Sequence, residues 1–257
     1  MTVSPVSSLN LNFLASSYIV RLAPSVVASL SSTQIASLST LTITRFTSLQ
    51  LAALTTSQMK AFTSTQVPAF TTAQIAFLTS SQVAALDNED LAVLTTSQIP
   101  VMGAKSFSAL SSSQIAQLSS SQVVSLTAAQ IIGLQSSAVA GIATAGLAAL
   151  SSGQINALSA IQAMSLRVTQ IQSLGTGQIS KLNASALAAL TSAQVQSFSS
   201  AQLANLTTAQ IAGLTTDQVT ALTSAQLGAL TSEKIVALTS AQAGALTSTQ
   251  LGALTSS

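Results

Sequence analysis

Residues 206–230 read LTTAQIAGLTTDQVTALTSAQLGAL, an eight-residue phrase that occurs three times and then begins again. We number the phrase from its Leu as position 0 and call each repeat an octad. Leu, Phe, Met or Ile stands at position 0 in steps of eight from Leu30 to Leu254. The apolar spacing continues back to Val6, where the rest of the phrase is missing. The sequence therefore predicts degenerate N-terminal capping units over 1–29 and one uninterrupted octapeptide array over 30–257.

The repeat length excludes two simple architectures. A continuous α-helix turns about 100° per residue, so eight residues overshoot two turns by roughly 80° and leave no constant face to bury. In a plain strand, positions 0 and 5 have opposite parity and point to opposite faces of a sheet. The chain must therefore bend once in every octad, which is typical of a solenoid.

Each octad carries a complete signal for the start of a helix. Thr or Ser at position 1 with Gln at position 4 matches the capping box, in which two side chains satisfy backbone N–H groups reciprocally. Position 4 is Gln at 21 of 28 sites from Gln34 to Gln250. The apolar residues at positions 0 and 5 match the two members of a hydrophobic staple. We therefore predict an all-α solenoid of very short capped helices over positions 2–6, with position 0 buried.

Two features keep a second architecture open. Pro68 and Pro100 stand at position 6, which only a very short or partly 3₁₀ helix tolerates. The Thr, Ser, Asp, Asn and Gly residues at position 1 are also typical of turns. A β-solenoid with a corner at position 1 is the alternative.

The composition argues against most chemistry. Charged residues make up 5% of the chain, against about 25% in a typical domain. The net charge of +2 comes from scattered residues, which is no footprint for a nucleic acid. The chain has neither His nor Cys, so a Ser-His-acid triad and a thiolate nucleophile are impossible. We predict no enzyme and no catalytic, cofactor-binding or metal-binding residues.

Membrane insertion is not expected either. Thr, Ser or Gln interrupts every apolar run well before the roughly 18 residues that a spanning helix needs. The chain has no basic residue before Arg21, so we recognise no signal peptide.

The only charge cluster is Asp87-Asn88-Glu89-Asp90. A calcium site is one interpretation, but the spacing lacks the Gly and the distal Glu of an EF-hand loop. We expect Asp87 to be an N-cap that begins a helix with an acidic first turn.

Three other local features depart from the plain phrase. Asn183 and Asn205 each begin a glycosylation sequon, and Asn183 is also a candidate N-cap. Two consecutive octads lack both the capping residue and the Gln, and they are either neutral variation or a weak joint; their residues at positions 1 and 4 are Gln135, Ala138, Ala143 and Gly146.

The consensus Leu-Thr/Ser-Thr/Ser-x-Gln-Ile/Val-x-Ala resembles octapeptide repeat tracts of large bacterial surface or adhesin-like proteins, often labelled as haem-utilisation proteins. The resemblance implies a bacterial protein that is extracellular or on the cell surface. It implies no cofactor here, because without His or Cys the axial ligation of haem would fall to residues such as Met or Tyr. The residues in question are Met59, Met102, Met164 and Tyr18.

These observations predict a non-enzymatic structural repeat protein that serves as a spacer, a stalk or a self-associating element. The alternative is an ice-binding solenoid that uses the Thr and Ser rows at positions 1 and 2. At the far end, Thr255 is an N-cap with no helix after it. We expect either that the array is longer or that the chain self-associates through its C-terminal end, because an open solenoid end exposes apolar surface.

Overall fold

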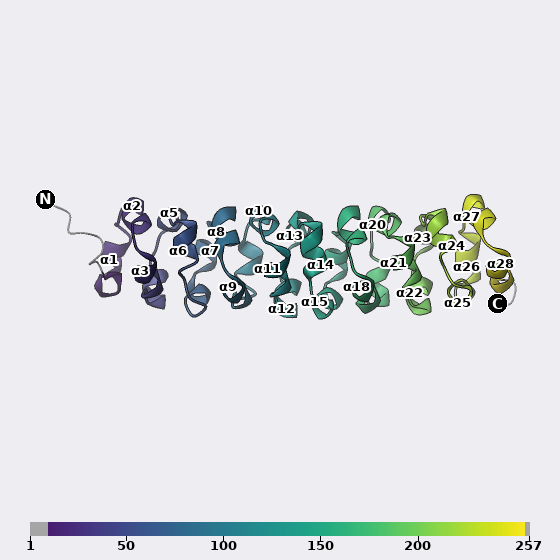
Figure 1. The fold of residues 1–257 in the computed structure, drawn as a ribbon, viewed down its shortest axis with the longest axis horizontal. Helices are drawn as coiled ribbons and strands as arrows, with labels where there is room; N and C mark the ends of the chain where they lie inside the picture. Colours follow the sequence, from purple (N-terminus) through teal and green to yellow (C-terminus); the bar gives the residue numbers. More distant parts are fainter. Residues whose placement is uncertain (1–9, 255–257) are drawn as a thin grey trace. The chain divides into compact units, whose positions relative to one another are not determined.

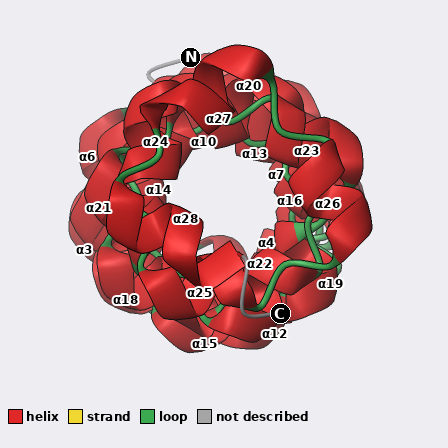
Figure 2. Cartoon of the chain, turned by 90° about the vertical axis from the view of Figure 1, so that its right-hand side faces the viewer, coloured by secondary structure: helices red, strands yellow, loops and turns green. Residues whose placement is uncertain are grey.

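The computed structural model describes residues 10–254, and every regular element within them is a helix. Figure 2 shows these helices in red, joined by short green loops, with no strand in the described range. The prediction of an all-α solenoid is confirmed, and the β-solenoid alternative is not supported. Val6 and Thr255 lie outside the described residues.

The chain divides into two compact units, an N-terminal unit (Met1–Leu134) and a C-terminal unit (Gln135–Ser257). We describe each by itself, and the single continuous array predicted over 30–257 stays a prediction. The helices of the N-terminal unit are η2 (Leu11–Phe13), α1 (Ser16–Ile19), α2 (Pro24–Ala28), α3 (Ser32–Ala36), α4 (Thr40–Ile43), α5 (Ser48–Ala52), α6 (Thr56–Met59), η3 (Val67–Ala69), α7 (Thr72–Ala76), α8 (Ser80–Ala85), α9 (Asn88–Ala92), η4 (Ile99–Val101), α10 (Ala104–Ser108), α11 (Ser112–Ala116), α12 (Ser120–Val124) and α13 (Ala128–Gly133).

The C-terminal unit repeats the same kind of short helix. Its helices are α14 (Ser136–Gly141), α15 (Thr144–Ala149), α16 (Ser152–Asn156), α17 (Ala160–Met164), α18 (Val168–Ser173), α19 (Thr176–Ile179), α20 (Ala184–Ala189), α21 (Ser192–Gln196), α22 (Ser200–Ala204), α23 (Thr208–Ala212), α24 (Thr216–Thr220), α25 (Ser224–Gly228), α26 (Ser232–Val236), α27 (Ser240–Ala245) and α28 (Ser248–Leu254).

A typical octad, residues 70–77, shows how the chain bends. Phe70 at position 0 and Thr71 at position 1 are both extended, with φ and ψ of −60° and 132° and of −69° and 156°. Positions 2–6 form α7, and Phe77 at position 7 stays in the helical region. Two extended residues thus separate each helix from the next, and the chain bends at this point. No described residue has a positive φ, so the bend requires no Gly.

The capping box forms as predicted. In the same octad, Gln74 N donates to Thr71 Oγ1 at 3.2 Å, and Thr71 N donates to Gln74 Oε1 at 2.9 Å. Where the hydroxyl is missing, the Gln half remains: Arg167 N donates to Gln170 Oε1 at 2.8 Å. The N-terminal octads differ, since the N-caps of α1 and α2 are Ala15 and Ala23, which make no side-chain cap bond.

The two prolines shorten their helices in the expected way. Pro68 lies in η3 and Pro100 in η4, and both elements are 3₁₀ helices. Because Pro has no N–H, the helix cannot make its usual bond from position 6. The bond from position 5 survives, with Val67 N donating to Thr63 O at 3.1 Å.

The core consists of the residues at positions 0 and 5. Every position 5 residue from Ile19 to Leu227 is at most 1% exposed, and every position 0 residue from Leu30 to Leu230 is at most 6% exposed. Neighbouring residues at position 0 contact one another, as in the edge-on rings of Phe62 and Phe70, whose centroids are 5.0 Å apart. The predicted burial of position 0 is confirmed.

Successive turns of the solenoid pack helix on helix. In the N-terminal unit α10 packs on both α8 and α13, and the three lie one after another along the upper edge of Figure 1. In the C-terminal unit α17 packs on α20, and α25 on α28. The partners in each pair are three octads apart. Together with the hydrogen bonds that the Gln side chains make to earlier octads, this spacing sets the number of octads in one turn.

The two octads without a cap residue form helices all the same. The N-caps of α14 and α15 are Gln135 and Ala143, and neither makes a side-chain cap bond. At position 4, Ala138 and Gly146 are buried. A joint at this place stays a prediction.

Candidate functional site

The most distinctive polar feature is a row of mostly buried amides, the Gln residues at position 4, which we call the glutamine ladder. Gln82 is representative. Its Oε1 accepts a hydrogen bond from Thr79 N at 2.9 Å, at the start of its own helix. Its Nε2 donates to Leu51 O and Leu54 O, both at 2.8 Å. One side chain therefore joins the first turn of α8 to the end of α5, 31 and 28 residues earlier.

The same spacing recurs in both units. In the C-terminal unit, Gln218 Nε2 donates to Leu187 O at 3.0 Å and to Leu190 O at 2.6 Å. The acceptors belong to position 5 of the octad four repeats earlier and to position 0 of the octad three repeats earlier. Together with the helix pairs three octads apart, these bonds give each turn between three and four octads.

The ladder solves a problem at the end of each helix. The last carbonyl groups of a helix have no partner within it, and leaving such a group buried and unpaired costs about 1–3 kcal/mol. Gln218 is 1% exposed and Gln170 is fully buried, so water does not supply the bonds. An amide fits because it combines an acceptor for the N-cap N–H with two donors for the carbonyls.

The capping box accounts for only the acceptor half of this role, and the donor half was not predicted. The sequence does contain a signal for it. Capping boxes accept Glu as well as Gln, yet no octad has Glu at position 4; Glu89 and Glu233 both stand at position 3. Glu would keep the acceptor and lose the donor, so its absence points to a required N–H group.

Other residues replace the amide in some octads. Where Ala186 occupies position 4, Asn183 Nδ2 at position 1 donates to Asn156 O at 2.9 Å and to Leu158 O at 2.7 Å. Where Lys234 occupies position 4, its ammonium group donates to Ala204 O. The sequon at Asn183 thus has its amide nitrogen engaged inside the array.

Asp90 is a polar exception at position 4, because a carboxylate has no proton to donate. Its side chain is 1% exposed, and Oδ2 has no hydrogen-bond partner. In a typical rung of the ladder, a Gln donates to carbonyl groups 31 and 28 residues earlier, as Gln82 does. A Gln at position 90 would therefore reach the carbonyl groups of Met59 and Phe62. Burial is the main cause that raises the pKa of Asp90 to about 6, and the charges of Asp87 and Glu89 add to it.

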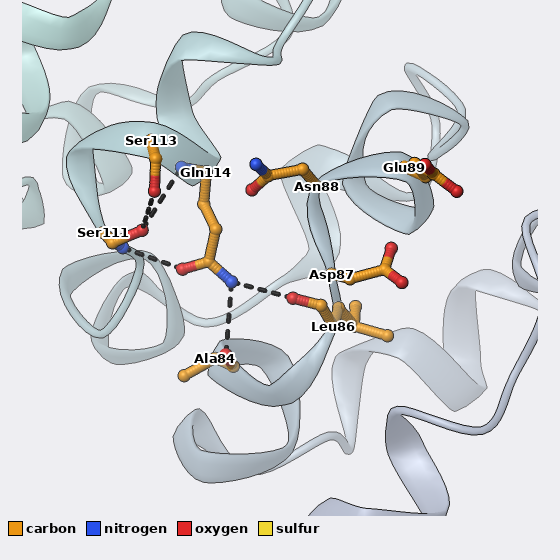
Figure 3. Close-up of a pocket in the computed structure, with 8 residues that line it drawn as sticks. All are labelled: Ala84, Leu86, Asp87, Asn88, Glu89, Ser111, Ser113 and Gln114. Atoms are coloured by element: carbon orange, nitrogen blue, oxygen red, sulfur yellow. Dashed lines mark hydrogen bonds between the residues drawn. The ribbon is translucent and has the colours of Figure 1, made fainter.

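The acidic cluster lies beside an open hollow of about 530 Å³ (Figure 3). Asp87 is the N-cap of α9, and its Oδ1 accepts from Asp90 N at 2.9 Å, as predicted. The opposite wall is a rung of the ladder, in which Gln114 Nε2 donates to Ala84 O and Leu86 O. Asp87 and Glu89 point away from Ser111 and Ser113 across the hollow. In the described part of the chain no three metal-ligating side chains come together.

The remaining candidates are dispersed. Met59 and Met102 fill core positions 5 and 0, whereas Met164 and Tyr18 are more than half exposed. Asn205 Nδ2 donates to Ala201 O at 2.9 Å, within its own helix end. No helix over residues 10–254 has both the length and the apolar content to cross a bilayer.

The substitution Gln202→Glu tests the donor half of a rung. Gln202 Nε2 donates to Ile171 O at 3.1 Å and to Leu174 O at 2.7 Å, and its Oε1 accepts from Ser199 N at 2.8 Å. Glu keeps the last bond and loses the other two. We expect a loss of about 2–3 kcal/mol in the opening free energy of α22, measured by hydrogen exchange at neutral pH. Gln196→Glu, at an exposed position on the neighbouring helix, is the control; an equal loss in both variants would contradict the role of the ladder.

Asp90 should make α9 less stable as the pH rises. A carboxyl group whose folded pKa lies above its ordinary value of 3.8 binds its proton more tightly in the folded state. The stabilisation that this tighter proton binding gives to the folded state is fully present below about pH 4 and is lost as the pH rises through 6. At about 1.4 kcal/mol per pKa unit, we expect the opening free energy of α9 to fall by roughly 3 kcal/mol between pH 4 and pH 7. Hydrogen exchange corrected for its intrinsic pH dependence measures this change.

Asp90→Gln is the matched control, since it restores the rung and removes the titration. It should abolish the pH dependence at α9 and slow exchange there at pH 7. If the variant keeps the dependence, the neighbouring Asp87 and Glu89 are its source instead.

The repeat itself is recognised by comparison with known proteins. A family model described as the ALTTAQ repeat matches residues 52–88, 83–120, 187–224, 198–232 and 224–256. Merged, the matches span 52–120 and 187–256, which is just over half of the chain. No curated protein sequence matches the chain. The Leu, the capping Thr and the ladder Gln of these matched segments are the residues that build the fold described above, and the chain belongs to the ALTTAQ repeat family.

Proposed function

We propose that this protein is a non-enzymatic structural element, a spacer or stalk whose function depends on its length. The observation that carries the proposal is the glutamine ladder. The buried amides are used in joining one turn to the next, as Gln170 and Gln218 do within the C-terminal unit. Each rung depends only on octads three and four repeats away, so octads can be added without altering the rest.

The capping hydroxyls support this function over ice binding. The Thr and Ser hydroxyls at position 1 accept hydrogen bonds from backbone N–H groups, as Thr215 Oγ1 does from Gln218 N at 3.2 Å. A hydroxyl that accepts such a bond is fixed at the start of its helix and has one acceptor site fewer for ordered water. The position 1 row therefore has a structural use that does not require ice binding.

The proposal also covers where the protein acts and how it associates with other copies. The resemblance to repeat tracts of large bacterial proteins supports a surface or secreted role. Self-association of the array is part of the same proposal.

Changing the number of octads tests the spacer. The chain has no Cys, and a Cβ atom added at Gly153 or Gly244 meets no atom within 4 Å, so Gly153→Cys and Gly244→Cys provide two labelling sites in the C-terminal unit. We insert one to eight copies of LTTAQIAG after Gly213 and measure the distance between spin labels by pulsed electron resonance. The mean distance should grow by the same increment with every four octads added.

An insertion of five residues at the same place is the control, because it breaks the frame and should give a broad distance distribution. A distance that does not grow with whole octads would overturn the spacer.

The location is tested on the cells that make the protein. An antibody against the exposed positions of the array should label intact cells, or the protein should be found in the medium. Labelling that requires permeabilised cells would contradict a surface or secreted role.

A further inference from the structure

The carbonyl groups that a rung joins converge on one point. Gln66 Nε2 donates to Ile35 O at 3.0 Å and to Leu38 O at 2.7 Å. Ala36 O lies 3.2 Å from the same nitrogen. Gln194 in the C-terminal unit makes the same three contacts at 2.6–3.2 Å. Such a helix end therefore presents three oxygen atoms, 31, 30 and 28 residues before the rung, to a single donor.

These oxygen atoms also accept charged donors. The Lys234 ammonium group donates to Ala204 O, 30 residues earlier. In the N-terminal unit, where Thr42 occupies position 4, Arg45 Nη1 donates to Leu14 O at 3.4 Å. Leu14 O is the carbonyl group 28 residues before Thr42, which a Gln at that position would reach. A positive charge can therefore take the place of the amide at a helix end.

At the Asp90 rung both sides are hydrogen-bond acceptors. By the spacing of the ladder, the carbonyl groups at the far end of this rung belong to residues 59, 60 and 62. Phe62 is buried, and no group within residues 10–254 donates to its carbonyl oxygen. The equivalent oxygen one octad later, Phe70 O, accepts from Gln98 Nε2 at 2.8 Å. Asp90 Oδ2 is equally buried and has no partner. Both sides of this rung therefore lack the donor that a Gln supplies.

The surroundings of Asp90 favour a positive charge. Asp87 and Glu89 belong to the same octad, and their charges act on the Asp90 carboxyl group. In the described part of the chain no basic side chain comes within hydrogen-bond distance of Oδ2. The side chain of Asp is also one methylene group shorter than that of Gln, so its oxygen stops short of the point on which the carbonyl groups converge. A cation at that point is attracted by the carboxylate on one side and by the carbonyl dipoles on the other.

We propose that the Asp90 rung binds a monovalent cation of the size of potassium or ammonium, held between the carboxylate and the carbonyl groups of residues 59, 60 and 62. The other rungs indicate the size, because their carbonyl oxygens lie 2.6–3.2 Å from the bound nitrogen. Mg²⁺ and Ca²⁺ bind oxygen at about 2.0–2.1 Å and about 2.3–2.6 Å, so both fit this spacing poorly. Backbone carbonyl oxygens are the ligands that replace water around potassium in channel filters. Since most of the ligands belong to the backbone, the composition gives no sign of this site.

Hydrogen exchange of α9 in the full chain tests the proposal at pH 8, where Asp90 is ionised because its pKa is about 6. The chain is compared in the chloride salts of potassium, ammonium, sodium and N-methylglucamine, each at about 150 mM so that screening is equal. N-methylglucamine is too large to enter the rung. We expect exchange to slow at least about fivefold in potassium or ammonium relative to N-methylglucamine, and the effect to saturate with concentration. Sodium should have a smaller effect, and the stronger of the first two salts identifies the preferred ion.

Two variants separate the site from general effects of salt. Asp90→Asn keeps the length of the side chain and removes its charge, so it should abolish the dependence of α9 on the cation. Asp217→Asn removes an exposed acid at position 3 and should leave that dependence unchanged.

Equal exchange of α9 in all four salts would overturn the proposal, and a proton would then be the group that completes the rung. A dependence that survives Asp90→Asn would overturn it as well. So would a stronger effect of sodium, or of calcium chloride at equal ionic strength, than of both potassium and ammonium. None of these outcomes alters the dependence of length on octad number, which tests the spacer separately.

Discussion

A single primary amide at position 4 of the octad is the constraint on which the rest of this structure depends. Its oxygen fixes the start of one helix, and its nitrogen satisfies the end of another helix a turn earlier, as Gln82 does between α8 and α5. Helices of four to seven residues are far too short to be stable alone. Here most of them are held at their ends by the neighbouring turns, so the array supplies the stability that a short helix lacks.

The apolar core follows from that arrangement. Position 5 is sealed by the next turn and position 0 by its neighbours along the turn, which explains why position 5 is buried from Ile19 to Leu227 and uncovered at Leu251. Few charges are needed, because the polar groups of the backbone are paired internally. The exceptions stand out for this reason: Asp90 brings a group with the wrong hydrogen-bonding capacity into a rung, and its raised pKa is the physical result.

Local features of the fold could be predicted from the sequence because they depend on residues close together in the chain. The capping box, the staple and the effect of Pro68 all act within one octad, and the helix over positions 2–6 agrees with the structure. The ladder acts over 28 and 31 residues, and its reach depends on the number of octads in a turn, which no local rule gives. The absence of Glu at position 4 was the available signal. The role of Asn183 as a substitute donor could not be inferred, because it depends on where Leu158 lies in space.

The bend made from two extended residues has a consequence for how such a chain changes over time. Since no described residue has a positive φ, no position of the octad is reserved for Gly on backbone grounds. Duplication or loss of a block of eight codons therefore joins two ordinary backbone conformations and needs no compensating change at the seam. Selection against substitutions then falls on the side chains at positions 0, 4 and 5. Genes of this family should consequently differ among close relatives more in the number of whole blocks than in the residues at these three positions.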